Sequence, residues 1–370
     1  MTSIAFTGDI SFSKYFKGAY KRDFIDPELV KFLKDSDHVV ANVECSLTDR
    51  EVTRVSNLTH ATPTEAACVL DAIGADIWTL ANNHIMDCGK EGLEDTMATA
   101  KAHGAKTIGA GMNVEEASAP LYLDEAGGIG IFSFCFDAKF LHADENTPGC
   151  MERGDLARIE RNIKAIKEKC RWCIVVAHTG FEFTQLPMPH IREMTVQYLK
   201  WGADIVVCHH PHVVQNYETF PDGKMIFYSL GNFIFDTDYQ RVQQHTEYGM
   251  LLKLHLNEEG FTWESCGLKV DRENQSIVKD EGPAIFREVD AKQYKLLWPL
   301  AVLDFVRNEK ISRTNLHPEW AENSARWWRK RLYKRVKKPA SDWIKKAKFV
   351  VKLGLWKKAD PVVVEYIDYK

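Results

Sequence analysis

Six side chains able to bind a metal ion follow short apolar segments of this sequence. Carboxylate and amide oxygens combined with imidazole nitrogens suit Mn, Fe or Zn, whereas an all-oxygen set favours Mg or Ca. A bridging carboxylate can hold two such ions about 3.5–4 Å apart, where they generate hydroxide and stabilise the attacking and leaving oxygens of a displacement. These residue types predict a paired metal centre that hydrolyses phosphate esters, built from Asp9, Glu44, Asn83, His178, His210 and His212.

The segments before these residues have the composition of β-strands. They are rich in β-branched and aromatic residues and alternate with helical patterns over the first 235 residues, which is typical of an α/β protein. We expect strands at Ile4–Thr7, His38–Asn42, Asp76–Leu80, Lys106–Gly109, Gly130–Phe136, Trp172–Ala177, Asp204–Cys208 and Met225–Ser229. We expect helices at Pro27–Lys34, Thr64–Ile73, Lys90–His103, Glu152–Lys169 and Pro189–Trp201.

The order of these elements brings the candidate ligands together. In open α/β sheets the carboxyl ends of the strands lie along one edge, so residues that are distant in sequence meet there. Strands that are apolar along their whole length predict helices on both faces of the sheet. After Gly231 the pattern changes to two longer strands, Tyr248–Leu256 and Phe261–Val270, around a turn at residues 257–260.

The composition excludes several classes of protein. The chain has 370 residues, 45% of them hydrophobic, and 48 Lys and Arg against 52 Asp and Glu, which argues against disorder and against a globally basic nucleic-acid binder. Nine irregularly spaced cysteines indicate thiols in a reducing compartment. The N-terminus lacks the features of a signal peptide, and no apolar run approaches the roughly 20 residues that span a bilayer. We therefore predict a cytoplasmic protein.

A change in composition near residue 285 divides the chain into two predicted domains, residues 1–285 and a basic, mostly helical extension at 286–370. Ala325–Lys358 contains 14 Lys and Arg and a single acidic residue, which leaves 34 basic and 51 acidic residues elsewhere. This amphipathic segment either lies on an anionic membrane surface, at the inner face of the membrane, or packs on the acidic body of its own protein. We expect no nucleic-acid partner.

Eight motifs, in this order along the chain, resemble the CapA-type capsule (poly-γ-glutamate) synthesis family of the calcineurin-like metallophosphoesterase superfamily. The resemblance spans about residues 3–270 and does not cover residues 285–370. The motifs are Gly8-Asp9, Asn42-Val43-Glu44, Ala81–Gly89, Ile108–Gly111, His178–Glu182, Gly202-Ala203-Asp204, His210–Gln215 and Tyr228–Asp236.

The resemblance implies an α/β fold, a layered α/β/β/α sandwich with mixed sheets, followed by the helical C-terminal extension. It also implies roles for the metal ligands. Asp9 and His212 would bind the first metal, Glu44 would bridge, and the second metal would be held by Asn83, His178 and His210.

Two residues beside the ligands are the candidates for catalysis. His84 would act as general acid or stabilise a phosphate oxygen, and Asp87 would orient it. Three more residues would contact the substrate or support the ligands. Glu182 is either such a residue or simply exposed, His209 supports the ligands or the structure, and Asn232 shapes the rim of the site.

Some positions depart from the pattern. Ser11 stands where the superfamily usually has a histidine, which leaves the first metal short of a nitrogen ligand, and Glu44 stands where many phosphoesterases have Asp. Residues 60–63 and Thr179 occupy positions where many relatives carry an Arg and a Trp.

Two functions remain open at this level. The first is a metal-dependent hydrolase of phosphate esters in capsule or cell-surface polysaccharide metabolism, acting on a phosphorylated or polymeric cell-envelope substrate. The alternative is a non-catalytic ligand-binding or assembly component of a capsule or poly-γ-glutamate synthesis machinery. The missing imidazole at Ser11 favours this alternative modestly.

Overall fold

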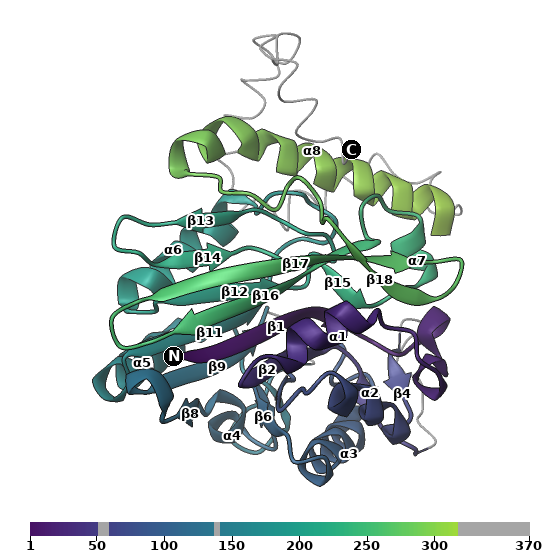
Figure 1. Ribbon diagram of the computed structural model, residues 1–370, viewed down its shortest axis with the longest axis horizontal. Coiled ribbons are helices and arrows are strands. Elements are labelled where there is room, and N and C mark those ends of the chain that lie inside the picture. Colours follow the sequence, from purple (N-terminus) through teal and green to yellow (C-terminus); the bar gives the residue numbers. More distant parts are fainter. Residues whose placement is uncertain (51–58, 137–140, 317–370) are drawn as a thin grey trace.

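The computed structural model describes residues 1–50, 59–136 and 141–316 (Figure 1). The basic segment Ala325–Lys358 lies outside the described residues, so its predicted contact with a membrane or with the body is not addressed by the structure. The domain boundary at residue 285 likewise stays a prediction.

Within the described residues, the larger sheet has eight strands and contains both parallel and antiparallel pairs. The N-terminal strand β1 lies in its middle, parallel to β2 and antiparallel to β16, while β15 pairs with the end of β1. The order is β18 (Ser276–Asp280), β17 (Phe261–Asp271), β16 (Tyr248–Leu256), β1 (Thr2–Ile10), β2 (His38–Val43), β5 (Ile77–Thr79) and β6 (Lys106–Ile108), with β15 (Asn232–Ile234) off this path.

The smaller sheet has six strands, and its central strands are parallel. Its order is β13 (Tyr217–Thr219), β14 (Met225–Phe227), β12 (Ile205–His209), β11 (Trp172–His178), β9 (Ile129–Cys135) and β8 (Leu121–Leu123). Two small pairs complete the described strands: β3 (Ser46–Leu47) with β4 (Ala61–Thr62), and β7 (Ala110–Gly111) with β10 (Gly149–Cys150).

The helices begin and end where the sequence provides start and stop signals. The helix α1 begins at Pro27 behind an Asp26 cap whose side chain accepts from the Glu28 N–H, and α6 ends at Gly202, which has a φ of +123°. The helices are α1 (Pro27–Lys34), α2 (Ala67–Ala72), α3 (Gly89–Ala102), α4 (Val114–Ser118), α5 (Leu156–Lys169), α6 (Pro189–Trp201), α7 (Asp238–Arg241) and α8 (Ala291–Leu316).

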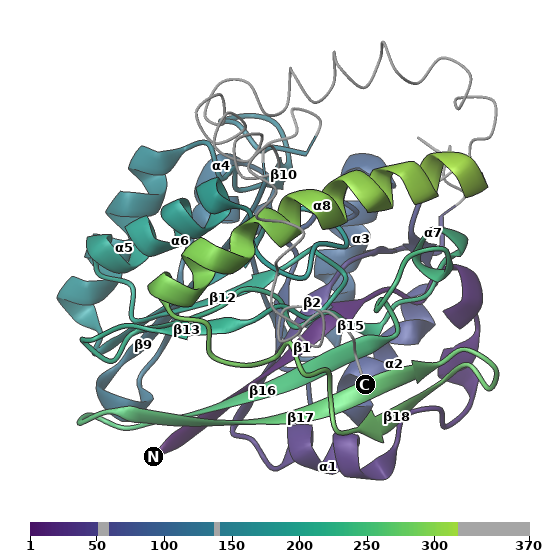
Figure 2. The ribbon, with the colours of Figure 1, turned by 90° about the horizontal axis from the view of Figure 1, so that it is seen from above.

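Three apolar clusters define four layers. Alternating residues of β1 and β2, such as Ala5 and Val39, pack against α1, α2 and α3 on one face of the larger sheet. The opposite face, which includes Phe6 and Val40, packs directly on Val176 and its neighbours in the smaller sheet. The far face of the smaller sheet is covered by α5 and α6. The α/β/β/α sandwich with mixed sheets is therefore confirmed (Figure 2).

The expectation of helices on both faces of the sheet was wrong. The helices α1 to α3 cover one face of the larger sheet, and α5 and α6 cover one face of the smaller sheet. The other two faces pack on each other, in a cluster that also includes residues of α8. A strand that is apolar along its whole length is buried on both faces. This pattern does not show whether a helix or a second sheet buries each face. The helix expected over Thr64–Ile73 is also divided, into a 3-10 turn at Thr64–Ala66 and α2.

The helix α8 belongs to the segment predicted to be helical beyond residue 285. In Figures 1 and 2 it runs across the molecule from the side of β13 toward α7. Its residues Tyr294, Trp298 and Ala301 are buried in the cluster that also fills the space between the sheets. Across the ranges that the structure describes, no helix combines the length and the hydrophobicity needed to cross a bilayer.

Candidate metal centre

The end of β1 is bent, and this bend aims Asp9 into the molecule. The pairing register with β2 shifts between Phe6 and Asp9, which is the signature of a bulge. Gly8 permits it, because a Cβ atom there would lie 2.4 Å from the carbonyl oxygen of Gly231. The Asp9 N–H donates to that same oxygen at 2.9 Å. Asp9 is fully buried as a result.

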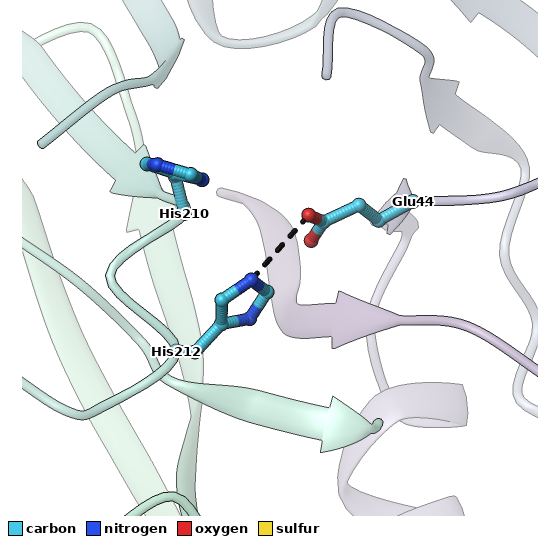
Figure 3. A group of neighbouring side chains, drawn as sticks. All are labelled: Glu44, His210 and His212. Atoms are coloured by element: carbon cyan, nitrogen blue, oxygen red, sulfur yellow. Dashed lines mark ion pairs between the residues drawn. The ribbon is translucent and has the colours of Figure 1, made fainter. Parts of the chain in front are cut away.

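Glu44 lies one residue beyond the end of β2, where its N–H donates to the Ile10 carbonyl at 2.7 Å. Figure 3 shows its carboxylate facing His210 and His212, which come from the loop after β12. Glu44 Oε1 lies 3.6 Å from His212 Nε2 and 3.5 Å from His178 Nε2. Glu44 therefore lies close to two histidines of the smaller sheet, one at the end of β11 and one in the loop after β12.

His178 and His209 end two neighbouring parallel strands and are paired in register. Paired residues point to the same side of a sheet, and here that side faces the larger sheet, as Val176 and Val207 do. His178 Nε2 lies 2.8 Å from Asn83 Oδ1, and His209 Nδ1 lies 3.2 Å from Asp9 Oδ1. His209 thus contacts a candidate ligand from the interior of the sandwich.

The turn at His210-Pro211-His212 has an unusual backbone. His210 has a φ of +98° and His212 a φ of +55°, values that residues other than glycine rarely adopt. In this turn the ring centroids of His210 and His212 lie 5.8 Å apart, and the ring centroids of His210 and His178 lie 5.0 Å apart. His212 Nδ1 lies 3.0 Å from Asn232 Oδ1 and 3.2 Å from Asp9 Oδ2, while Nε2 faces Glu44.

The loop after β5 carries Asn83, His84 and Asp87. The Asn82 side chain ties this loop to β2 by donating to the Val43 carbonyl at 2.8 Å, next to Glu44. His84 Nδ1 lies 2.8 Å from Asp87 Oδ2, so the carboxylate orients the imidazole ring. The predicted pairing of these two side chains is present in the structure, and their catalytic roles stay predictions.

Burial and mutual charge shift the ionisation of the site. Burial would raise the pKa of Asp9, but contacts with His209 and His212 hold it well below its usual range. Burial and the charge of Asp9 raise the pKa of Glu44 to about 8. Burial also lowers the pKa of His178 and of His210 well below the usual value, which leaves these imidazoles neutral and able to bind a cation.

The donor atoms fit divalent ions. Asp9 Oδ2, both Glu44 oxygens and His210 Nδ1 are buried without a hydrogen-bond partner among the described residues. Asp9 Oδ2 and Glu44 Oε1 do lie 3.2–3.6 Å from histidine nitrogens, but outside hydrogen-bond geometry. Carboxylate oxygens buried without a hydrogen-bond donor are costly, and a cation would offset that cost. Ligands of one ion at about 2.1 Å lie about 3.0–3.4 Å from each other. The separations of 2.8–3.6 Å between the donor atoms of Glu44, Asn83, His178 and His212 are close to this range.

Two groups of buried side chains can each hold an ion, and Glu44 belongs to both. One group is Asp9, Glu44 and His178, and the other is Glu44, His210 and His212. The resemblance instead placed His212 with Asp9, and His210 with His178. The division of ligands between two ions stays a prediction, whereas the shared position of Glu44 is a feature of both groups.

Sequence reasoning assigned no role to Asn42 and noted His60 only as part of residues 60–63, which depart from the family pattern. Asn42 Nδ2 donates to Asp9 Oδ1 at 2.7 Å. His60 is buried, its ring stacks on His84 with centroids 4.0 Å apart, and its Nδ1 lies 2.8 Å from Ser11 Oγ. An imidazole from a distant loop therefore lies beside the position where the superfamily's histidine is replaced by Ser11. The only sequence signal for it was the departure of residues 60–63 from the family pattern.

The remaining predicted residues lie at the edge of the centre. Asn232 is buried and also donates to the Thr246 carbonyl at 2.8 Å, and Glu182 accepts from Tyr239 Oη at 3.0 Å. Thr179, the second unusual position, accepts from Arg153 Nη1 at 3.0 Å.

The comparisons with known proteins show the family of this chain. Residues 3–237 match the family model described as bacterial capsule synthesis protein PGA_cap. The chain is 30% identical over 266 residues to the PGA biosynthesis protein CapA of Bacillus subtilis, covering 70% of this chain and 68% of that protein. It is 28% identical over 271 residues to the capsule biosynthesis protein CapA of Bacillus anthracis, covering 70% and 64%. The chain belongs to the PGA_cap family of bacterial capsule synthesis proteins.

The chain thus spans about two thirds of the length of these relatives. Among solved structures, TT1561 of Thermus thermophilus matches 75% of this chain and 98% of its own, with 11% identity and a TM-score of 0.37. That score is too low to support an argument, so the fold rests on the layers described above.

Proposed function

We propose that this protein is a metal-dependent hydrolase of phosphate esters that acts on a phosphorylated or polymeric cell-envelope substrate in capsule or poly-γ-glutamate metabolism. The observation that carries the proposal is the position of Glu44, which belongs to two groups of buried ligands at once. One carboxylate shared by two groups is the arrangement that a pair of divalent ions requires. The names of the two CapA relatives support the pathway.

The ligands would be Asp9, Glu44, Asn83, His178, His210 and His212, and their oxygen and imidazole donors favour Mn, Fe or Zn. Divalent ions, when bound, supply Lewis acidity to a phosphoryl oxygen and lower the pKa of a water molecule.

The chain's own residues supply the remaining chemistry. His84 would donate a proton to the leaving oxygen, because its Nδ1 is held by Asp87 and its ring lies next to the ligand Asn83. Asn42 would orient Asp9 by donating to Oδ1, which leaves Oδ2 available to a cation. The buried rings around the ligands, such as Phe235 at 4.5 Å from His212, would exclude bulk water from that side of the site.

The test is metal analysis combined with turnover of an aryl phosphodiester and an aryl phosphomonoester. We expect the wild type to bind metal and to hydrolyse at least one ester, and His178→Ala and Asn83→Ala to lose both metal and turnover. His255→Ala is the matched control, because this histidine lies at the surface beside Glu264, away from the site. Bound metal without turnover on either ester, or on cell-envelope precursors, would contradict the hydrolase.

The second candidate function is a non-catalytic component that binds a phosphorylated precursor or polymer. Ser11 favours it, since the first metal lacks the usual nitrogen ligand. The same experiment separates the two functions, because the binding component would retain metal or ligand and show no turnover.

A further inference from the structure

The loop between β11 and α6, residues 179–188, lies between the metal centre and the C-terminal helix α8. On one side it contacts the turn that carries His210 and His212. Gly180 packs so closely on Pro211 that an added Cβ would lie 3.0 Å from the proline ring. Farther along, the Thr184 carbonyl accepts from Gln215 Nε2 at 2.5 Å.

Phe183 is the residue of this loop with the most constrained backbone. Its φ of +62° is in the left-handed region, which is unfavourable for a residue other than glycine. Both of its peptide groups are bonded to other segments. The N–H donates to the Pro211 carbonyl at 2.8 Å, and the carbonyl accepts from Asn308 Nδ2 of α8. The Phe183 ring lies 6.2 Å from the ring of His212, nearly parallel to it.

A second contact with α8 lies two residues farther along the loop. The Gln185 N–H donates to Asp304 Oδ2 at 3.2 Å. Asp304 and Asn308 are one helical turn apart and are 5% and 3% exposed. Between them, Phe305 contacts Phe181 edge to face at 5.3 Å. Burying two polar side chains is costly unless they are bonded, and both are bonded to the backbone of this loop.

We propose that Asn308 and Asp304 are positioning residues of the metal centre. They hold residues 183–185 in place. The loop then supports the His210-Pro211-His212 turn and places Glu182 beside it. The proposal rests on the proposed function for the metal centre itself. It adds a part of the chain that lies beyond the family match at residues 3–237. The helix α8 would thus be a component of the site.

The consequence for the site follows from the contacts of the loop. His212 has a strained backbone, and the bond from Phe183 to Pro211 is made in the middle of its turn. Glu182 is held on the adjacent side by Tyr239, whose ring lies 5.1 Å from that of Phe183. If the Phe183 carbonyl loses its partner on α8, the loop can relax toward an unstrained backbone and His212 loses its support.

Two substitutions of nearly unchanged shape test this. Asn308→Asp removes the donor and places a carboxylate oxygen against the Phe183 carbonyl. Asp304→Leu removes the oxygen that accepts from the Gln185 N–H. Leu296→Ala is the control on the same helix, because Leu296 is 77% exposed. The first measurement is hydrogen exchange of the peptide covering residues 179–188, in the full chain without metal. Two separate measurements give the affinity for Mn²⁺ and the visible spectrum of the Co²⁺-loaded protein.

We expect Asn308→Asp to exchange at least tenfold faster in this peptide, to bind Mn²⁺ about 10–100-fold more weakly and to show an altered Co²⁺ spectrum. Asp304→Leu should change exchange and Mn²⁺ affinity in the same direction as Asn308→Asp. Leu296→Ala should remain within about threefold of wild type in exchange and affinity, with an unchanged spectrum. A purely structural role would lower the melting temperature of Asn308→Asp and leave the Co²⁺ spectrum at saturation unchanged, which would overturn the proposal.

Wild-type exchange and affinity in Asn308→Asp would overturn it as well. If Asn308→Asp does not fold, Asn308→Ser, which keeps a shorter donor, is expected to show a smaller change in the same direction, and no change would contradict us. Exchange needs neither metal nor turnover. A wild type that binds no metal would therefore refute the proposed function, while the exchange result still reports on the contact between the loop and α8.

Discussion

Asn83 Oδ1 lies 2.8 Å from His178 Nε2, although the two residues are 95 positions apart in the chain and belong to different sheets of the sandwich. Asn83 follows β5 of the larger sheet and His178 ends β11 of the smaller one. The candidate metal centre is therefore formed across the interface of the two sheets, and the apolar cluster between the sheets determines how its halves meet.

The pair formed by His84 and Asp87 gives the first prediction. We expect His84→Gln to lower turnover of an aryl phosphate ester about 10²–10⁴-fold, because a proton donor is lost. Asp87→Asn should lower it about 10–100-fold, because the ring loses its orientation. Metal content, measured by elemental analysis, should stay at the wild-type value in both variants. A variant with normal metal content and normal turnover would remove that residue from the proposed chemistry.

The contact between His60 and Ser11 gives the second prediction. His60→Ala should weaken Mn²⁺ binding about tenfold, since this imidazole lies beside Ser11 and stacks on His84. Ser11→His alone should destabilise the protein, because the new ring would meet His60, whose Nδ1 lies 2.8 Å from Ser11 Oγ.

The double variant Ser11→His with His60→Ala provides the control for this interpretation. Its new imidazole has room, so we expect it to fold and to bind Mn²⁺ more tightly than His60→Ala does. Titration calorimetry of the three variants measures this. Equal affinities for wild type and His60→Ala would show that His60 does not support the centre.

Glu44 gives a prediction for the metal-free protein. Its pKa is about 8 when folded, against 4.5 for a free glutamate side chain, so the unfolded chain ionises first as the pH rises. The contribution of Glu44 to stability is therefore present below pH 4.5 and is lost as the pH rises toward 8. Glu44→Gln has no carboxyl group to ionise, so it avoids this loss of stability. It should raise the free energy of unfolding of the metal-free protein at pH 8 by about 0.5–2 kcal/mol and abolish metal binding.

Chemical unfolding of both proteins at pH 5 and pH 8, with a chelator present, measures the effect. The free energy of unfolding of the variant should exceed that of the wild type by more at pH 8 than at pH 5. A variant that is less stable than wild type at both values would mean that Glu44 is not an unpaired buried carboxyl in the metal-free protein.

The basic segment Ala325–Lys358, which lies outside the described residues, gives a prediction from sequence. Each cation near an anionic lipid surface contributes about 1 kcal/mol, so the full chain should co-sediment with vesicles that contain anionic lipid, and less so at high salt. A chain ending at residue 316 should not. Equal sedimentation of the two proteins would favour packing of the segment on the body.

The sequence predicted the long elements well, and it also located the short strands β5, β6 and β14 but not the other short strands. Pro27–Lys34 and Pro189–Trp201 agree with α1 and α6 at both ends, because a proline begins each helix and each carries a clear apolar face. Tyr248–Leu256 agrees with β16. The short strands that were not predicted, such as β3 and β15, have no long apolar run of their own, since their pairing is decided by partners distant in the chain.

The site shows the same division. Strand-end positions were enough to select residues that the fold then gathers, such as Asp9, Glu44 and His178. The contacts made by His60 and Asn308 depend on a loop and a helix that cross the site from elsewhere, and no spacing in the sequence indicates them.

Anomalous diffraction from crystals soaked in Mn²⁺ tests the central claim most directly. The account predicts density for the ion within bonding distance of Glu44, with His178 on one side or His210 and His212 on the other, and its loss in Glu44→Gln. Absence of anomalous density at Glu44 in crystals that take up Mn²⁺ elsewhere would contradict it.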